Sequence, residues 1–229
     1  MPAVSIIVPV LDEARAIEAA LVPLQAWRAA GAEVVVVDGG SRDATRALAA
    51  PLADRVMTAE RGRAAQMNAG ARASAGDVLL FLHADTLLPA DAMAAVVTGA
   101  ASDGWGRFDV AIEGADPLLA LVALTMNLRS RLTGIATGDQ AIFVARAAFE
   151  AAGGFPDIPL MEDVALSKAL RRRSPPVCLR QRVLTSGRRW ERHGTLRTIL
   201  LMWRLRLAYA LGADPHRLAR RYDVEHTSS

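Results

Sequence analysis

DVLLFLHADT, residues 77–86, is an apolar run of strand length that ends abruptly in His83, Ala84 and Asp85. If this stretch is a buried strand, two side chains that can bind a metal, those of His83 and Asp85, lie at its carboxyl end. In open α/β sheets, ligands bind at the edge formed by the carboxyl ends of the strands. The stretch therefore predicts a parallel sheet with a polar site at that edge.

Short apolar runs and helical patterns alternate on both sides of this stretch. Further strands are predicted at Val4–Val10, Glu33–Asp38 and Arg55–Thr58. Helices are predicted at 14–30, 42–50, 63–74 and 89–101, with Ser41 as the N-cap of the second. Pro9 has no N–H to donate to a central ladder, so we expect the first strand to stop there. The alternation predicts an α/β fold, with a mainly parallel central sheet and helices on both faces.

The second half of the chain is less regular. It predicts strands at 107–113, 141–145 and 177–183, helices at 116–132, 162–173 and 195–211, and a loop around Trp190. We expect one domain over residues 1–229. Residues 1–101 would form a nucleotide-binding half, residues 102–193 an acceptor and catalytic half, and residues 194–229 a C-terminal helical extension.

Composition places the chain among globular proteins, with 52% hydrophobic and 22% charged residues. The net charge is +3, and Lys168 is the only lysine, so arginine supplies the basic character. Arginine suits bidentate phosphate contacts, although a GC-rich genome produces the same bias. Cys178 is the only cysteine, which excludes an internal disulfide and a cysteine-based zinc site. The N-terminus lacks a signal-peptide pattern and no apolar run reaches the length of a membrane span, so we expect a cytoplasmic protein.

Three loops follow predicted strands and should meet at one edge of the sheet: residues 9–13, 38–43 and 83–85. Asp38 stands where a carboxylate could hold a ribose or a base. The alternative is that Asp38 starts a turn and caps the next helix. No G-x-G-x-x-G follows the first strand and no P-loop is present, which argues against a Rossmann dinucleotide site and a P-loop NTPase.

Asp85 and His83 offer an oxygen and an imidazole suited to Mn²⁺ or Mg²⁺ bridging a diphosphate. Such a metal acts as a Lewis acid on a phosphate leaving group. One carboxylate is not a metal site, and a lone aspartate at a strand end is also a common turn residue. We expect His193, in RRWERHG, to fold back as the second metal ligand.

Further polar residues have both a functional and a structural interpretation. Glu162 and Asp163, in PLMEDVAL, could supply a general base that deprotonates an acceptor hydroxyl. Alternatively, they are acidic residues in a first helical turn, where they interact favourably with the helix dipole. Asp139 binds sugar hydroxyls or satisfies a turn. Arg189, with Arg188, clamps a diphosphate beside Trp190, which would pack on a sugar, or else the arginines are simply solvated.

Five blocks in this order resemble the family 2 glycosyltransferases, which have the GT-A fold. They are SIIVPVLDEA, VVVVDGGSRDAT, RGRAAQMNAGA, GDVLLFLHADT and GGFPDIPLMEDVALSKALR, and RRW at 188–190 resembles an Arg-Trp motif of some members. The resemblance covers residues 3 to 193. FLHADT, GDQAIF and IPLMEDV further resemble a bacterial branch associated with arsenosugar biosynthesis.

The resemblance implies an inverting, metal-assisted transfer from a nucleotide-sugar donor to a small-molecule or lipid-linked acceptor. Pro9, Glu13 and Asp38 would line the nucleotide pocket, and Arg63 would reach the base or the phosphates. Asp85 matches the last Asp of the family's D-x-D signature, and would hold the metal.

The resemblance also assigns Asp163 as the base and His193 as a third metal ligand. Two departures weaken this inference. Gly39 stands where the family often has a second Asp that contacts the base. His83 replaces the first carboxylate of D-x-D, which affects the ribose contact or the metal preference.

The predicted helix at 195–211 is apolar on nearly all sides, with Arg197, Arg204 and Arg206 interspersed. This pattern suits packing onto the domain or homodimerisation, which we favour, or peripheral contact with the inner face of the membrane. The alternative to an enzyme is a catalytically altered GT-A-like module that binds a nucleotide or a membrane surface. Few aromatic residues are available to stack on bases, which argues against nucleic acid as a partner.

Overall fold

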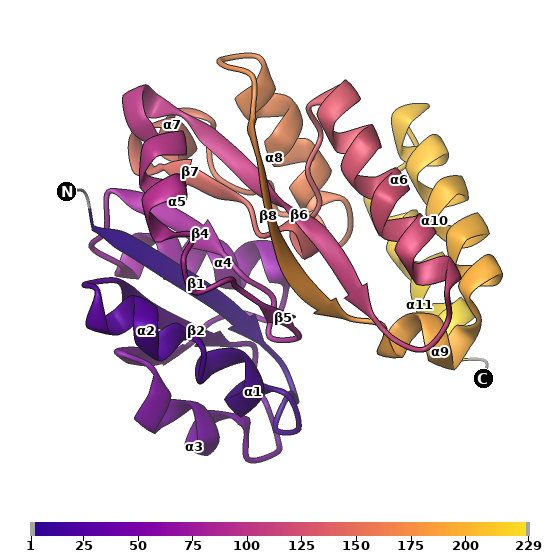
Figure 1. The fold of residues 1–229 in the computed structure, drawn as a ribbon. Coiled ribbons are helices and arrows are strands. Elements are labelled where there is room, and N and C mark those ends of the chain that lie inside the picture. Colours follow the sequence, from indigo (N-terminus) through magenta and orange to yellow (C-terminus); the bar gives the residue numbers. More distant parts are fainter. Residues whose placement is uncertain (1–2, 228–229) are drawn as a thin grey trace.

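The computed structural model describes residues 3–227, apart from the side chains of Arg189 and of residues 223–227. An eight-stranded sheet with the strand order β3-β2-β1-β4-β7-β6-β8-β5 runs through the described residues (Figure 1). The strands are β1 (Val4–Val10), β2 (Glu33–Asp38), β3 (Arg55–Thr58), β4 (Val78–Phe81), β5 (Thr86–Leu87), β6 (Trp105–Glu113), β7 (Phe143–Ala145) and β8 (Val177–Ser186).

The first four strands of this order, β3-β2-β1-β4, are all parallel. The apolar runs of β1, β2 and β4 are buried on both faces, as expected for parallel strands that helices cover on each side, whereas the edge strand β3 is partly exposed. The strand β7 then joins antiparallel to β4 and to β6. Beyond it β6 and β8 are parallel, and β5 is antiparallel to β8. The predicted α/β fold with a mainly parallel sheet is confirmed.

Helices cover both faces of the sheet and extend past one end (Figure 1). The α-helices are α1 (Ile17–Leu21), α2 (Leu24–Ala29), α3 (Thr45–Ala49), α4 (Arg63–Ala73), α5 (Met93–Gly99), α6 (Leu118–Thr133), α7 (Arg146–Ala151), α8 (Glu162–Arg171), α9 (Arg188–His193), α10 (Thr195–Ala210) and α11 (Pro215–Thr227). One core contains Ile6 and Val8 of β1 with α1, α2, α3 and α5. The other contains Ile7 of β1 with α4, α7 and α8.

A third apolar cluster attaches the C-terminal helices to the rest of the chain. Leu201 and Leu205 of α10 and Leu218 of α11 pack with Met161 and Val164 at the start of α8. Figure 1 shows α6, α10 and α11 at the end of the molecule that β6 and β8 reach. In the described part of the chain, no helix combines the length and the apolar character that crossing a bilayer requires.

Several predicted boundaries are wrong, for local reasons. Pro9 lies inside β1, which continues to Val10. Leu82 N–H donates to the Ile7 carbonyl, so the backbone N–H and C=O groups of odd-numbered residues of β1 point toward β4. Because β4 ends at Phe81, no carbonyl of β4 requires an N–H donor at position 9, and proline is tolerated there.

The predicted helix at 14–30 is two helices, because Pro23 cannot donate an intrahelical hydrogen bond and the chain breaks there. Ser41 does not cap a helix, since α3 begins only at Thr45. The segment around Trp190 is the helix α9 instead of a loop, and β8 extends to Ser186.

Candidate active site

The loops after β1 and β2 are held together by their own side chains. Asp12 N–H donates to Ser41 Oγ at 2.9 Å, and Arg42 N–H donates to Asp12 Oδ1 at 2.8 Å. Glu13 N–H donates to Thr45 Oγ1 at 2.8 Å. Asp12 itself adopts a left-handed conformation, with φ 53°. These contacts fix the backbone of Glu13 at the carboxyl edge of the sheet, where the sequence predicts a site.

Asp38 is buried and its carboxylate is used within its own turn. It accepts hydrogen bonds from Gly40 N–H at 3.1 Å, from Ser41 N–H and from the Ser41 hydroxyl. Pro9 is likewise buried in β1. Neither residue lines the two cavities described below, so the turn-capping interpretation describes the contacts of Asp38 in the structure.

Gln66 of α4 closes the back of this edge. Its side-chain amide donates to the Val10 carbonyl at 2.9 Å and to the Val37 carbonyl at 2.7 Å, which joins the ends of β1 and β2. A Cβ atom on Gly39 would lie 3.0 Å from Gln66 Oε1. The residue that replaces the family's second Asp is therefore packed against Gln66.

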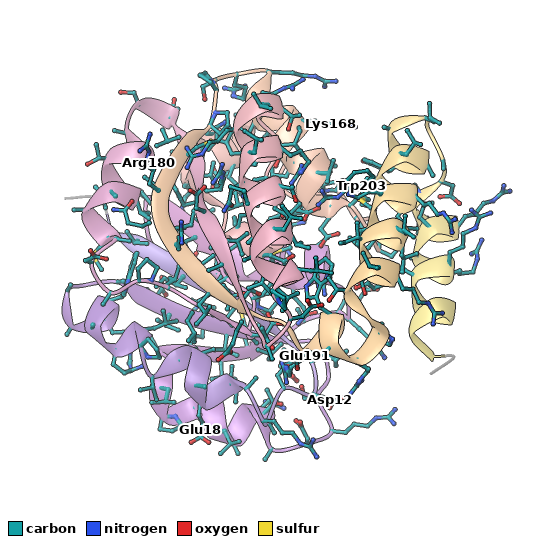
Figure 2. All side chains as sticks on the ribbon, turned by 45° about the vertical axis from the view of Figure 1, so that its right-hand side comes forward. Asp12, Glu18, Lys168, Arg180, Glu191 and Trp203 are labelled. Carbon is teal, nitrogen blue, oxygen red and sulfur yellow. The ribbon has the colours of Figure 1, made fainter. Side chains whose placement is uncertain are left out.

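A cavity of about 820 Å³ opens between this edge of the sheet and the helices α6, α9 and α10. It brings together six residues that the sequence predicts for the site, namely Glu13, Arg63, Asp85, Asp139, Trp190 and His193. The opposite wall is apolar and comes from α6 and α10. Figure 2 shows Trp203 on the side of α10 that faces α6. One half of the cavity is thus charged and the other half is hydrophobic.

A second cavity, of about 50 Å³, adjoins the large one and contains Glu162, Asp163 and His83. Arg63, Asp139, Met202, Arg206 and Tyr222 line both cavities. Because Met202 and Arg206 belong to α10 and Tyr222 to α11, the C-terminal helices lie over the pair of carboxylates. The two cavities form one candidate site with a wide outer part and a narrow inner part.

His83 and Asp85 face different parts of this site. The His83 Nδ1 atom lies 3.5 Å from Asp139 Oδ1, and its ring packs so closely on Gly138 that a Cβ atom there would overlap it. Asp85 faces the large cavity, and its backbone carbonyl accepts a hydrogen bond from Ser186 N–H at 3.0 Å. The two residues predicted to act at one point are therefore divided between the inner and the outer part.

Backbone strain positions the carboxylate pair. Met161, immediately before α8, has φ 71°, and Ala141 has φ 47° after the short helical turn at 138–140. The Asp163 carboxylate accepts hydrogen bonds from Gly138 N–H at 2.8 Å and from Val164 N–H at 2.6 Å. Left-handed conformations at residues other than glycine cost free energy and often mark functional sites. Here three of them, including that of Asp12, surround the candidate site.

Burial perturbs the ionisation of several groups in the inner part. Desolvation, followed by repulsion from Asp163, raises the pKa of Glu162 to about 7. Although desolvation lowers it, attraction from Glu162, Tyr222 and Asp139 gives a net rise in the pKa of Arg63. Perturbed ionisable groups in a cleft are typical of functional sites.

Glu13 and Arg188 form an ion pair at the mouth of the large cavity, with 3.6 Å between Oε2 and Nη2. Burial raises the pKa of Glu13, attraction from Arg188 opposes this, and repulsion from Asp85 adds to it. Glu13 and Asp85 are therefore close enough to interact electrostatically.

The carboxylates in the large cavity fit a hard divalent cation that takes most of its ligands from a diphosphate. Mg²⁺ and Mn²⁺ prefer oxygen ligands, and Mg²⁺ is often held by one or two carboxylates plus substrate phosphates. Asp85 with Glu13 beside it provides this type of donor set. Among the side chains that the structure describes, no three of His, Cys, Asp or Glu are grouped as a metal site.

Sequence reasoning missed the contributions of the C-terminal helices to the site. Met202, Arg206 and Tyr222 line both cavities, but their spacing in the sequence gives no signal for it. The sequence predicts Arg188 as a partner of Arg189 at a diphosphate, whereas in the structure Arg188 pairs with Glu13. The side chain of Arg189 lies outside the described residues.

Comparisons with known proteins agree with the block order in the sequence. The model of the family "Glycosyl transferase family 2" matches residues 5–110. No curated protein sequence matches the chain.

Solved glycosyltransferase structures share the fold. Mannosyltransferase PcManGT from Pyrobaculum calidifontis, in complex with GDP-Man and Mn²⁺, is similar with a TM-score of 0.65 and 23% identity over 99% of this chain and 70% of that one. TarS 1–349 from S. aureus has a TM-score of 0.63 and 18% identity over 81% of this chain and 60% of its own. Glucosyl-3-phosphoglycerate synthase from Mycobacterium tuberculosis has a TM-score of 0.58 and 20% identity over 79% and 70% of the two chains.

These identities are low, so the structural likeness shows the fold. No comparison tests the resemblance to the arsenosugar branch, which stays a prediction. Residues 5–110 are therefore similar to glycosyl transferase family 2, and the chain as a whole has the GT-A fold.

Proposed function

We propose that the protein transfers a sugar from a nucleotide-diphosphate donor to an acceptor hydroxyl, with inversion and with Asp163 as the general base. The observation that carries the proposal is the joined pair of cavities. The outer one holds Glu13, Arg63 and Asp85, and the inner one holds Glu162 and Asp163. Structures of similar fold were solved with GDP-Man and Mn²⁺, and with UDP, Mn²⁺ and glucosyl-3-phosphoglycerate, which supports a donor of this class.

The donor diphosphate belongs in the charged half of the large cavity. Arg63 and Arg188 line this region, and charge-assisted hydrogen bonds from arginine suit phosphate oxygens. Asp85 would hold a divalent cation, with His193 as a second ligand from the other side of the cavity. A bound Mn²⁺ or Mg²⁺ supplies Lewis-acid stabilisation of the charge on the departing diphosphate.

The sugar belongs where the two cavities meet, because the donor and the base must both reach its anomeric carbon. Asp139 lines both cavities and can accept hydrogen bonds from sugar hydroxyls, while Trp190 offers a ring to the sugar face. His83, 3.5 Å from Asp139, fixes the direction of that carboxylate. In this arrangement His83 is a positioning residue.

The chemistry requires an ionised base beside the acceptor. Glu162 is almost fully buried, and its raised pKa of about 7 leaves it protonated in about half of the molecules at neutral pH. Asp163 is only half-buried, and two backbone N–H groups orient its carboxylate. Asp163 takes the acceptor proton as the acceptor oxygen bonds to the anomeric carbon, and the bond from that carbon to the diphosphate oxygen breaks with release of the nucleotide diphosphate.

Two substitutions separate donor binding from transfer. Asp163→Asn keeps a side-chain oxygen that can accept the hydrogen bond from Gly138 N–H, so the variant should retain nucleotide binding. Its transfer rate should fall roughly 10²–10⁴-fold, because the general base is lost. Asp85→Ala should lose the Mn²⁺-dependent part of nucleotide binding. Asp157→Asn, an exposed carboxylate before α8, is the matched control and should change neither property.

Binding is measured by calorimetry with UDP, GDP, ADP, CDP and dTDP, each with and without Mn²⁺, and this panel also identifies the base of the donor. Transfer is measured as release of the nucleotide diphosphate from the matching nucleotide sugar. Loss of binding and transfer together in folded Asp163→Asn would remove the base assignment. No binding of any nucleotide by the folded wild type would favour the non-catalytic module.

A further inference from the structure

The helix α6 carries an exposed apolar stripe along its whole length. Its members are three or four residues apart, so they share one side of the helix: Leu118, Leu121, Leu124, Leu128 and Leu132. The opposite side of α6, with Leu119, Val122 and Ala123, is buried against the domain. The helix therefore has two hydrophobic sides, and only one of them is used for folding.

The neighbouring helix α10 has the same arrangement. Its exposed stripe consists of Leu196, Leu200, Trp203, Leu207 and, at the C-cap, Leu211. Trp203 is 69% exposed and Leu211 is 80% exposed. Leu201 and Leu205 lie on the opposite side and pack into the third cluster. The apolar residues that nearly encircle this helix in the sequence therefore divide into an inner face and a separate outer stripe.

Together the two stripes form what we call the α6/α10 apolar face. In the described part of the chain thirteen large hydrophobic side chains are exposed, and ten of them belong to this face. Single exposed leucines are ordinary on protein surfaces, but a cluster of this size marks an interaction site. The two helices contact each other, and side chains of both line the large cavity.

The charges on these helices indicate what the face binds. The helix α10 contains Arg197, Arg204 and Arg206. The helix α6 contains Arg129 and Arg131, of which Arg131 pairs with Asp109 of β6, and neither helix contains Asp, Glu or Lys. Arg197 and Arg204 are exposed, and they are seven positions apart, so they lie on the same flank of the α10 stripe. Apolar side chains bordered by arginines are complementary to a lipid surface with anionic head groups.

The same charges argue against a second copy of the chain as the partner. A two-fold symmetric dimer would place the same arginine-bordered surface on both sides of the interface. Neither helix contains a carboxylate that could neutralise Arg197 and Arg204. Anionic lipid removes this repulsion, whereas a second copy does not.

We propose that the α6/α10 apolar face seats the protein on the surface of an anionic lipid bilayer. The helices lie along the surface, with the leucines and Trp203 among the upper acyl chains and Arg197 and Arg204 at the phosphates. Because Leu118, Leu121, Leu196 and Trp203 also line the large cavity, that cavity opens beside the bilayer.

The test is flotation of the full chain with vesicles of phosphatidylcholine alone or with about 30% phosphatidylglycerol, in the absence of donor. The wild type should bind the anionic vesicles, and less so at high salt. Leu200→Glu with Trp203→Glu should weaken binding more than tenfold. Val22→Glu, an exposed apolar position at the end of α1 outside the face, should leave it unchanged.

A second variant tests the charge without touching the apolar residues. Arg197→Gln with Arg204→Gln should lower the partition constant roughly fivefold for each arginine, the equivalent of about 1 kcal/mol each. Failure of the folded wild type to bind anionic vesicles overturns the proposal, and so does unchanged binding in the Leu200→Glu, Trp203→Glu variant. A concentration-dependent dimer that this variant abolishes, without vesicle binding, would assign the face to a second copy instead.

Discussion

Replacing Glu162 by Gln should stabilise the protein at neutral and alkaline pH and have almost no effect in acid. Glu162 is 5% exposed, and its pKa rises from 4.5 to about 7 in the folded state. The folded protein therefore binds a proton that the unfolded chain releases between these two values. Stability decreases as the pH rises through this window, because ionised Glu162 is unfavourable in the fold.

The size of the effect follows from the two pKa values. A shift of this size corresponds to about 3.4 kcal/mol when Glu162 is fully ionised. The penalty is only about 0.2 kcal/mol at pH 4, about 3 kcal/mol at pH 7 and close to its limit at pH 8.5. Glutamine has nearly the shape of the protonated side chain and no charge. The free energy of unfolding of Glu162→Gln should therefore exceed that of the wild type by these amounts at each pH.

Urea unfolding of the wild type and of Glu162→Gln at several pH values between 4 and 8.5 measures the difference. Glu150→Gln, an exposed carboxylate on α7, is the control and should stay within about 0.5 kcal/mol of the wild type throughout. Parallel stability profiles for the wild type and Glu162→Gln would refute the reasoning. So would a variant that is less stable than the wild type at pH 8.5.

Two further substitutions test the packing of the inner site and the burial of a charge on α6. Gly138→Ala should push His83 away from Asp139 and destabilise the fold by about 1–3 kcal/mol in thermal unfolding. Adding His83→Ala should recover part of that loss, and no recovery would show that the His83 ring does not cause it. Arg129→Met should stabilise the protein by about 1 kcal/mol at pH 7, because desolvation and the nearby Arg206 lower the pKa of Arg129 to about 10 and so disfavour its charged form. A loss of stability in urea for Arg129→Met would mean that its hydrogen bond to the Ile135 carbonyl outweighs that cost.

The parallel half of the sheet could be predicted because each strand there is a local signal. Runs such as residues 34–37 are apolar throughout, and covered parallel strands need that pattern wherever they pair. The neighbourhood of Glu13 and Asp85 followed from the same logic, since carboxyl ends of parallel strands share an edge. The errors at Pro9 and Ser41 came from partners distant in the sequence, which local rules do not include.

The inner part of the site could not be predicted in this way. His83 faces Asp139 only because Gly138 leaves space for its ring, and that contact joins residues far apart in the chain. Arg206 and Tyr222 reach the site because Leu201, Leu205 and Leu218 pack on the start of α8. The exposed stripes of α6 and α10 could not be recognised in the sequence either. Each helix is hydrophobic on two sides, and only the structure shows which side is buried.

The short strand β5 gives the order of chain synthesis a consequence for the site. Thr86 of β5 pairs with Thr185 of β8, their hydroxyls are 3.0 Å apart, and Ser186 N–H holds the Asp85 carbonyl. During translation, the four parallel strands are complete about a hundred residues before β8 leaves the ribosome. The Asp85 loop is held only once that strand has paired with β5, so a nascent or truncated chain can contain the four parallel strands without a fixed Asp85.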